Sequence, residues 1–549
     1  MRKSFLYKCF FWCTNPISTV AGAALLLAIA GLLSRLLGLI RDRILASMFG
    51  AGDILDIYYA SFRIPDFLYG VLVLGALSAA FIPVFTKVYA KESPQNAWKL
   101  TSDFLILLIG AIGVIGFFAM LFMPILIHGI APGFDGEKRE MAILFSRIML
   151  LSPILLGASA VFGGVLIARK SFLAYSLAPI FYNIGIIFGA LVLVDLWGLP
   201  GLAWGVIVGA LMHFCVQMPA TFRSGYVFAL PREAPWKNKQ VRKILLLMLP
   251  QVFSVASGQI NFWIITIFAS LMASGSLAVF NLANNLQSIP LALVGVSFAV
   301  AVFPKLSQSA SDGDMKEFTQ TFLKTLRRIL YFVIPATVFL ILLRAQIVRV
   351  VLGGGVFDWK DTVLTYQVLG ILSLSLFAQS LLPLIVRAFY SLEDTKTPFF
   401  IALFSQAINI LIVISTLHIW GVYSLALGFS VANTVQVAFL IFILKKRFTF
   451  FDVHDFYITL LRIIFATLVS ALAIQTVKYF WGSLTEIDTF IKIFGQLMVA
   501  SFFGLLVYIL MSHVLKIEEF CDFRNKVYIR IFGKPRTIAV SQQQDIEGM

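Results

Sequence analysis

Long apolar runs alternate with short polar and basic segments along almost the whole chain. Each run is about 20 residues or longer, the length that an α-helix needs to cross a hydrocarbon core of about 30 Å. The runs predict about fourteen transmembrane helices, at residues 18–48, 55–88, 102–129, 141–168, 173–195, 198–222, 242–272, 277–304, 322–352, 362–391, 397–419, 421–444, 457–480 and 489–515. The pattern therefore predicts an all-α polytopic membrane protein.

Composition supports this class and excludes several others. Only 13% of the 549 residues are charged and 60% are hydrophobic, whereas soluble domains carry roughly a quarter charged residues. Four cysteines and five histidines are scattered without metal-ligand spacing, so we expect no metal and no cofactor. The chain has no Walker A, HExxH or GxSxG motif, so it is predicted to be neither an ATP-driven motor nor an enzyme.

The net charge of +16 is distributed unevenly between the two sides of the predicted helices. About thirty-one of the 43 Lys and Arg residues fall on one side when the N-terminus is placed inside, which is the positive-inside bias. We therefore expect both termini in the cytoplasm and the protein in the cytoplasmic (inner) membrane of a bacterium. The basic charge indicates topology and contact with membrane lipids, and no nucleic-acid partner is expected.

The chain contains an internal duplication at an offset of 223 residues. "ASMFGAGDILDIYYASFRIP" (Ala46–Pro65) is similar to "ASLMASGSLAVFNLANNLQSIP" (Ala269–Pro290), and "LWGLPGLAWG" (Leu196–Gly205) is similar to "IWGVYSLALG" (Ile419–Gly428). Such repeats in membrane chains indicate two transport half-units. The predicted organisation is an N-terminal extension (1–17), an N-lobe of six helices (18–222), a basic cytoplasmic linker (223–241), a C-lobe of six helices (242–444), two further helices (457–515) and a cytoplasmic tail (516–549).

Charged residues lie inside the first two predicted helices, where a bilayer makes them costly. Arg35 and Asp42 are seven residues apart and share one helix face, and Arg41 lies beside that face. Asp56 and Arg63 repeat this spacing on the second helix. One interpretation is a charge ladder that joins the two helices. The other is a cationic cavity wall for an anionic headgroup, because guanidinium groups bind phosphate oxygens in bidentate fashion.

Two further sets of residues receive different predictions. Arg43 is expected to point outward to lipid, with no functional role. The second lobe offers amides in place of charges, in "FNLANNLQSIP", where Asn284 and Asn285 stand out. Amides inside membranes either join helices to one another or line a cavity, and the sequence leaves both interpretations open.

Several stretches together resemble one family. "SRLLGLIRDRILASMFGAG", "FRIPDFLYGVLVLGALSAAFIPVF", "APGF", "LAPIFYNIGII", "FASLMASGS", "FPKLS" and "AFYSLEDTKTP" are similar to the MurJ (MviN) family of bacterial lipid II flippases, within the multidrug/oligosaccharidyl-lipid/polysaccharide exporters. The resemblance runs from about Ile17 to Leu515. It implies fourteen helices in two lobes around a central cavity, a lipid-tail groove on the last two helices, and transport of lipid-linked peptidoglycan precursor to the outer leaflet.

The resemblance also implies a substrate site. Arg35, Arg41 and Asp42 match positions of the first helix that line the cavity, and Asp56 and Arg63 match polar positions of the second. Asn284, Asn285 and Arg387 are the nearest matches in the second lobe. Lipid II or a similar undecaprenyl-linked glycan is the expected substrate, with cell-wall synthesis or division proteins as candidate partners. A flippase for another polyprenyl-linked oligosaccharide, a drug/ion antiporter and a non-transporting scaffold of envelope synthesis remain alternatives.

Overall fold

The structure is a computed structural model that describes residues 20–74, 80–231, 233–447, 454–484, 489–522 and 524. The predicted N-terminal extension (1–17) and most of the predicted tail lie outside the described residues.

Every named element in these ranges is helical, and the described residues contain no β-strand. The α-helices are α2 (Val20–Phe49), α3 (Asp53–Ser61), α4 (Arg63–Tyr69), α5 (Ile82–Lys91), α6 (Pro94–Leu121), α7 (Met123–Ile130), α8 (Gly136–Met149), α9 (Ser152–Ala168), α10 (Phe172–Phe188), α11 (Val194–Trp197), α12 (Pro200–Arg223), α13 (Lys239–Ser270), α14 (Ser276–Pro290), α15 (Ser297–Ser311), α16 (Met315–Val351), α17 (Trp359–Ser373), α18 (Leu376–Ser391), α19 (Lys396–Trp420), α20 (Val422–Arg447), α21 (His454–Leu484) and α22 (Phe490–Val514). Short π-helices η1 (Gly70–Leu74), η3 (Gly189–Leu193) and η5 (Leu291–Val296) and a 3₁₀ turn η4 (Pro235–Lys237) connect some of them.

Each predicted span coincides with a helix or with consecutive helices, so the all-α membrane class is confirmed. Ten helical segments in the described residues are long and apolar enough to cross a membrane, or eleven when the bent pair α17 and α18 is taken as one span. The count of fourteen stays a prediction. The second predicted span is the most interrupted, because it contains α3, α4, η1 and α5 in place of one continuous helix.

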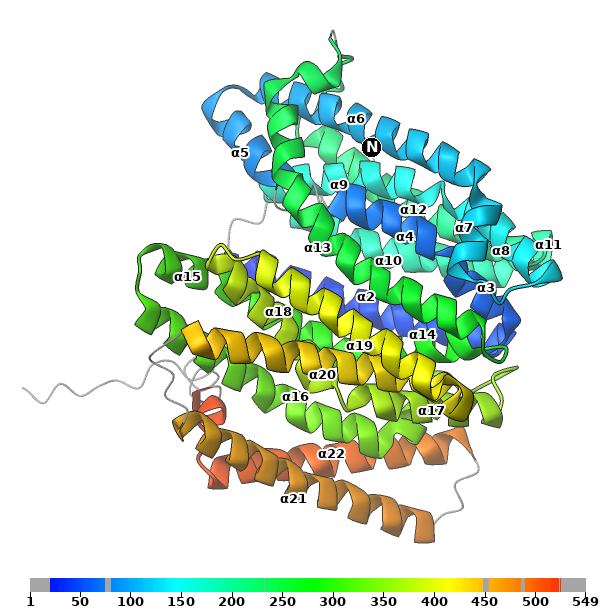
Figure 1. The fold of residues 1–549 in the computed structure, drawn as a ribbon, viewed down its shortest axis with the longest axis vertical. Helices are drawn as coiled ribbons and strands as arrows, with labels where there is room; N and C mark the ends of the chain where they lie inside the picture. The colour runs from blue at the N-terminus through cyan, green and yellow to red at the C-terminus, as the bar shows by residue number, and fades with distance from the viewer. Residues whose placement is uncertain are drawn as a thin grey trace, which may run out of the picture.

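The helices form two neighbouring groups, with α3–α12 in the upper part of Figure 1 and α14–α20 below them. We call α2–α12 the N-terminal half and α14–α20 the C-terminal half. Helix α13 runs between them and contacts α4, α6 and η1 on one side and α14, α19 and α20 on the other. Helices α21 and α22 pack against each other and against α16, outside both groups (Figure 1).

The two halves match in backbone detail at the offset of the sequence repeat. Gly198 and Gly421 both adopt positive φ, +69° and +50°, at the turn that precedes the last helix of each half. Only glycine enters this region of φ without steric cost. A π-helix interrupts the second helical stretch of each half shortly after the Ile-Pro pair, at η1 and at η5.

The hydrophobic core is shared at one end of the molecule and divided at the other. One cluster of buried residues contains side chains from both halves, including Leu55, Phe145, Phe280 and Phe357. Two other clusters belong to one side each: the first is built around Phe85 and Phe104 with the start of α13, and the second around Phe322, Leu384 and Phe389 of the C-terminal half. The shared core lies near the helix ends that the charge pattern assigns to the outside of the cell.

Candidate functional site

Helix α2 carries an ion pair that is linked to both halves. The Arg41 guanidinium donates to Oδ1 of Asp42, at 2.8 Å from Nη2 and 3.0 Å from Nε. Its Nη1 also donates to Asn183 of α10 at 3.1 Å. Across the interface, Asn285 of α14 donates to the second oxygen of Asp42 at 3.0 Å. Asp42 is 3% exposed, so its charge is compensated by these partners and not by bulk water.

Arg63 at the start of α4 makes a second link between the halves. Its Nε donates to the Thr266 hydroxyl at 2.7 Å, and its Nη2 donates to the side-chain oxygen of Asn281 at 3.0 Å. The guanidinium lies over the Phe262 ring, 5.3 Å from the centroid. The Trp263 indole donates to the Arg63 carbonyl oxygen at 3.3 Å. Arg63 is therefore held by α13 and α14, and the two side chains to which it donates hydrogen bonds are neutral.

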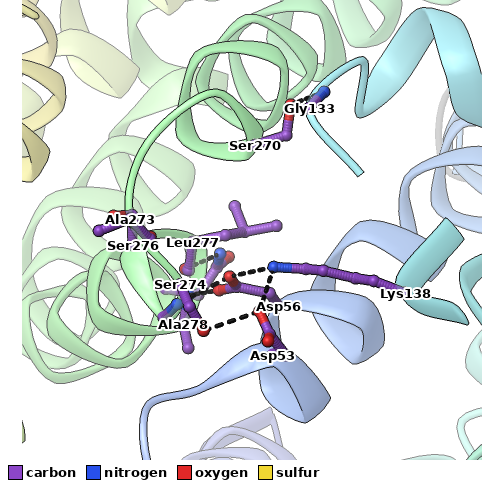
Figure 2. A network of polar contacts seen from close by, with 12 residues as sticks. Asp53, Asp56, Gly133, Lys138, Ser270, Ala273, Ser274, Ser276, Leu277 and Ala278 are labelled. Atoms are coloured by element: carbon purple, nitrogen blue, oxygen red, sulfur yellow. Dashed lines mark hydrogen bonds and ion pairs between the residues drawn. The ribbon is translucent and has the colours of Figure 1, made fainter. Parts of the chain in front are cut away.

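Asp56 of α3 caps the first turn of α14. Its Oδ2 accepts from the Gly275 amide at 2.8 Å, and its Oδ1 accepts from the Ala278 amide at 2.9 Å (Figure 2). The first amides of a helix have no partner within the helix and carry partial positive charge, so a carboxylate is a favourable cap. Asp56 is 1% exposed. An acidic side chain of the N-terminal half thus completes a helix of the C-terminal half.

Lys138 of α8 supplies the positive charge beside this cap. Its Nζ donates to Oδ2 of Asp56 at 3.1 Å and also pairs with Asp53 (Figure 2). Asp53 additionally accepts from the Ser274 hydroxyl at 2.7 Å. Burial opposes ionisation of the Asp53 carboxyl, but the hydrogen bonds from Lys138 and Ser274 outweigh that effect and hold its pKa below the ordinary value.

Backbone contacts between loops complete this end of the interface. The Val356 amide donates to the Ser47 carbonyl oxygen at 2.8 Å, and the Ala51 amide donates to the Asp361 carboxylate at 2.8 Å. The loop before α14 also packs closely against the loop after α2. Gly275 allows this contact, because a Cβ at that position would lie 1.7 Å from the Ala51 carbonyl oxygen. We call this set of contacts, together with Asp53, Asp56, Lys138 and Ser274, the outer seal, after the side of the membrane that the charge pattern predicts for it.

The prediction that Arg43 points outward to lipid is wrong. Its Nη1 donates to the Val350 carbonyl oxygen of α16, and its guanidinium lies 5.3 Å from the centroid of the Phe490 ring of α22. Arg43 therefore joins α2 to the C-terminal half and to the appended helices. Sequence spacing gives the face of a helix, but it does not identify the helix that packs on that face.

The remaining predicted site residues lie outside these networks. Arg35 is half-buried on α2, and no hydrogen bond or ion pair joins it to another described residue. Asn284 is half-buried on α14 next to Asn285. Arg387 of α18 donates to the Pro383 carbonyl oxygen of its own helix at 3.1 Å. Arg35 and Asn284 share helices with the Arg41–Asp42 pair and its partner, whereas Arg387 belongs to a different part of the C-terminal half.

Sequence reasoning missed three residues of the site. Asn183 accepts from Arg41, Thr266 accepts from Arg63, and Lys138 pairs with Asp56. Asn183 stands alone as an amide in the apolar stretch "PIFYNIGII", which is a usable signal for a buried polar contact. Lys138 lies in a loop-proximal segment 82 residues from Asp56, and nothing in its local sequence indicates that partner.

Comparison with known proteins identifies the family. The family model for the lipid II flippase MurJ matches residues 45–510, which is most of the chain. The chain belongs to the MurJ family. A probable lipid II flippase MurJ of Buchnera aphidicola (subsp. Acyrthosiphon pisum) is 30% identical over 497 residues, 89% of this chain and 96% of that protein. The one of Rhizobium tropici is 30% identical over 427 residues, 75% of this chain and 79% of its own length.

Solved structures agree on the fold. A structure titled lipid II flippase MurJ, inward closed conformation, superposes with a TM-score of 0.74 at 24% identity, covering 92% of this chain and all of that one. An inward-facing multidrug transporter of the MATE family superposes with a TM-score of 0.64 at 14% identity, covering 75% and 94%. MurJ proteins and MATE transporters therefore share this architecture, and at these identities the likeness shows the fold alone.

Proposed function

We propose that this protein flips lipid II from the inner to the outer leaflet of the cytoplasmic membrane by alternating access. The observation that carries the proposal is membership of the MurJ family over residues 45–510. The protein is then a transporter and not an enzyme. Its task is to replace the water around a pyrophosphate–sugar–peptide headgroup with fixed polar groups, since that headgroup cannot cross hydrocarbon unaided at useful rates.

The headgroup enters, in this proposal, between the halves at the end where their cores are separate. Arg35 is the first contact for the pyrophosphate, because its guanidinium has no acidic partner among the described residues. Arg41 and Arg63 follow deeper in the interface, with Asp42, Asn284 and Asn285 contacting the sugar hydroxyls and peptide amides. Each arginine contributes a planar fork that matches phosphate oxygens. Arg387 is a candidate for an accessory contact nearer the C-terminal half.

Opening toward the outer leaflet requires the outer seal to separate. Asp56 would leave the amides of Gly275 and Ala278, and Arg63 would leave Asn281. Each broken contact leaves a charged group that needs a new partner, which water provides once the seal opens. Binding of the anionic headgroup favours this step when it draws Arg41 and Arg63 away from their present partners.

We infer a multi-pass topology with both termini in the cytoplasm, from the positive-inside distribution of Lys and Arg. The seal then faces the outer leaflet. A reporter fused after Asn238 or Lys446 reads cytoplasmic under this inference, and one placed in "APGFDGEKRE" reads external. A reversed result at either position refutes the orientation.

Depletion of the protein in its host tests the function. Lipid II accumulates in the inner leaflet if the proposal holds, as measured by the fraction accessible to an externally added lipid II-degrading enzyme. Accumulation of another polyprenyl-linked sugar points to the related flippase alternative. Accumulation of neither points to an antiporter or to a scaffold of envelope synthesis.

A further inference from the structure

A pocket of about 430 Å³ lies on the C-terminal half, and none of its lining residues belongs to the outer seal or to the Arg41–Asp42 pair. It is formed by α16, α17 and the turn between α19 and α20, and Arg344, Gln367, Trp420 and Tyr423 are among its lining residues. Leu374 and Trp420 are 58% and 49% exposed at its wall. The pocket therefore combines a cation, an amide and aromatic rings on an open, largely apolar surface.

The position of this pocket across the membrane follows from the spacing of charged residues on two neighbouring helices. On α16, 15 uncharged residues (329–343) separate Arg328 from Arg344, and on α21, 15 uncharged residues (463–477) separate Arg462 from Lys478. Each interval of 16 steps rises about 24 Å along a helix, slightly less than a hydrocarbon core of about 30 Å. With Arg328 and Arg462 at the inner boundary, Arg344 and Lys478 reach the outer boundary together.

A contact between the two helices supports this alignment. The Lys478 ammonium donates to the Leu342 carbonyl oxygen of α16 at 2.7 Å, two residues before Arg344. Two positive charges therefore lie at similar depth on α16 and α21, at the end where the positive-inside rule disfavours them. In the described residues neither Arg344 nor Lys478 has an acidic partner.

The arginine is built into the pocket and is not simply extended toward the membrane surface. Its Nη1 donates to the Ile341 carbonyl oxygen of its own helix at 3.3 Å, three residues nearer the membrane centre. Its guanidinium lies 5.8 Å from the centroid of the Tyr366 ring. Gly370 provides space for the Arg344 side chain, because a Cβ at position 370 would lie 3.1 Å from Arg344 Cδ. A snorkelling side chain would instead follow its helix outward to the interface.

We propose that this pocket binds the phosphate of an anionic glycerophospholipid of the outer leaflet. Arg344 supplies the charged fork, and Gln367, which accepts from the Tyr423 hydroxyl, offers its amide N–H groups to headgroup oxygens. Trp420 stands at the interfacial level that amphipathic rings favour. Ile341, Ile371 and Leu374 provide an apolar wall for an acyl chain. The bound lipid would bridge α16, α17 and the α19–α20 turn.

Titration of the purified, delipidated full chain with dioleoyl phosphatidylglycerol, followed by native mass spectrometry, tests this site without any transport assay. We expect Arg344→Gln to weaken the tightest bound lipid at least tenfold and Arg344→Lys to weaken it less. Arg147→Gln is the matched control, because Arg147 is also a half-buried arginine that donates to a backbone carbonyl, that of Met120, and it does not line this pocket. It should change the affinity less than twofold.

Gly370→Ala provides a second variant that keeps the charge and displaces Arg344. We expect Gly370→Ala to weaken lipid binding several-fold. If Arg344→Gln does not fold, the lipid affinity of Gly370→Ala tests the proposal in its place. Unchanged lipid affinity in the folded variants overturns the proposal. Displacement of the lipid by millimolar inorganic phosphate would indicate a site for a soluble anion, and preferential retention of undecaprenyl phosphate would indicate a polyprenyl lipid. Either result also overturns it.

Discussion

The carboxylate of Asp56 lies 2.8 Å from the amide nitrogen of Gly275, so the N-terminal half caps a helix of the C-terminal half. A second bond to the Ala278 amide uses the other carboxylate oxygen. A cap supplied from another part of the fold couples helix stability to the distance between the halves. The first turn of α14 is satisfied by Asp56 only while the outer seal is closed.

Asp56→Asn should shift the protein toward the outward-open state. The amide keeps one acceptor oxygen but loses the charge that both the α14 amides and Lys138 require. Loss of one charged hydrogen-bonding partner in a buried site costs about 1.5–3 kcal/mol, a factor of roughly ten to a hundred in the closed-to-open ratio. Spin-label distances between the outer ends of α3 and α14 measure that ratio.

Asp53→Asn is the matched control for this substitution. Asp53 contacts the same lysine, but its side chain is 55% exposed, whereas that of Asp56 is 2% exposed. Exposed ion pairs contribute little, typically about 0–1 kcal/mol. If the two variants open the seal equally, the cap on α14 is not its main contact.

Acid on the outer face should loosen the seal. The pKa of Asp53 is lowered in the closed state, because the bonds from Lys138 and Ser274 outweigh the effect of burial. A carboxylate with a depressed pKa stabilises the closed state above its ordinary pKa of about 3.9, and this contribution is lost as the pH falls through the depressed value. The Asp53 contribution should therefore be unchanged between pH 7 and 5 and decline below about 4.

Ser274→Ala tests the assignment of that pH dependence. It removes one of the bonds that lower the pKa of Asp53 and leaves Lys138 in place. The acid-induced opening, followed by the same spin-label distances, should then begin at a higher pH than in the wild type. An unchanged titration curve would exclude Asp53 as the responsible group.

Arg35→Ala and Arg41→Ala should both abolish flipping, but with different effects on stability. Arg35 makes no bond to a described residue, so its removal should leave the melting temperature nearly unchanged. Arg41→Ala leaves the buried Asp42 without its cation, which costs several kcal/mol in a buried pair. Lysine at either position should restore flipping only in part, because the fork is lost. Full lipid II export by both alanine variants would refute the substrate assignment.

The sequence predicts the positions of the helices better than it predicts the breaks within them. Apolar length places both ends of α19 and α20 within three residues, because each is one uninterrupted span. The break between α3 and α4 was not predicted, since Arg63 begins a new helix in a segment that reads as continuous. The partners of Arg63, Thr266 and Asn281, are more than 200 residues away in the sequence.

The site was predictable only in its residue types. Charges inside an apolar helix identify Arg41, Asp42 and Asp56 as special, because a bilayer makes them costly. Sequence spacing placed Arg35 and Asp42 on one helix face, and the structure pairs Asp42 with the adjacent Arg41. Sequence reasoning included Asp56 in the substrate site, and it did not identify the bonds that Asp56 makes with α14 and Lys138. Local periodicity gives the orientation of a side chain but not the identity of a distant neighbour.

Arg43→Ala should weaken the closed state and is therefore not expected to be silent. The variant removes the bond to the Val350 carbonyl and the contact with the Phe490 ring. We expect a closed-to-open shift smaller than that of Asp56→Asn, because Arg43 remains half-buried and water can replace part of its contact. Spin-label distances between α2 and α16 report it. Distances equal to those of the wild type would mean that this contact does not hold the halves together.

The membrane potential should drive flipping, and sodium should not. The headgroup is anionic and the cell interior is negative, so outward movement is favoured by about 2.3 kcal/mol per charge per 100 mV. Coupling to sodium requires carboxylates arranged to bind it. Among the described residues, no three His, Cys, Asp or Glu side chains lie together in a group that could hold a metal ion. Asp42 and Asp56 are each engaged by a cation. In proteoliposomes, collapse of the potential should slow flipping strongly, and replacement of sodium at fixed potential should change it little. Sodium-dependent flipping at zero potential would contradict this prediction and would direct the search to carboxylates outside the Arg41–Asp42 pair.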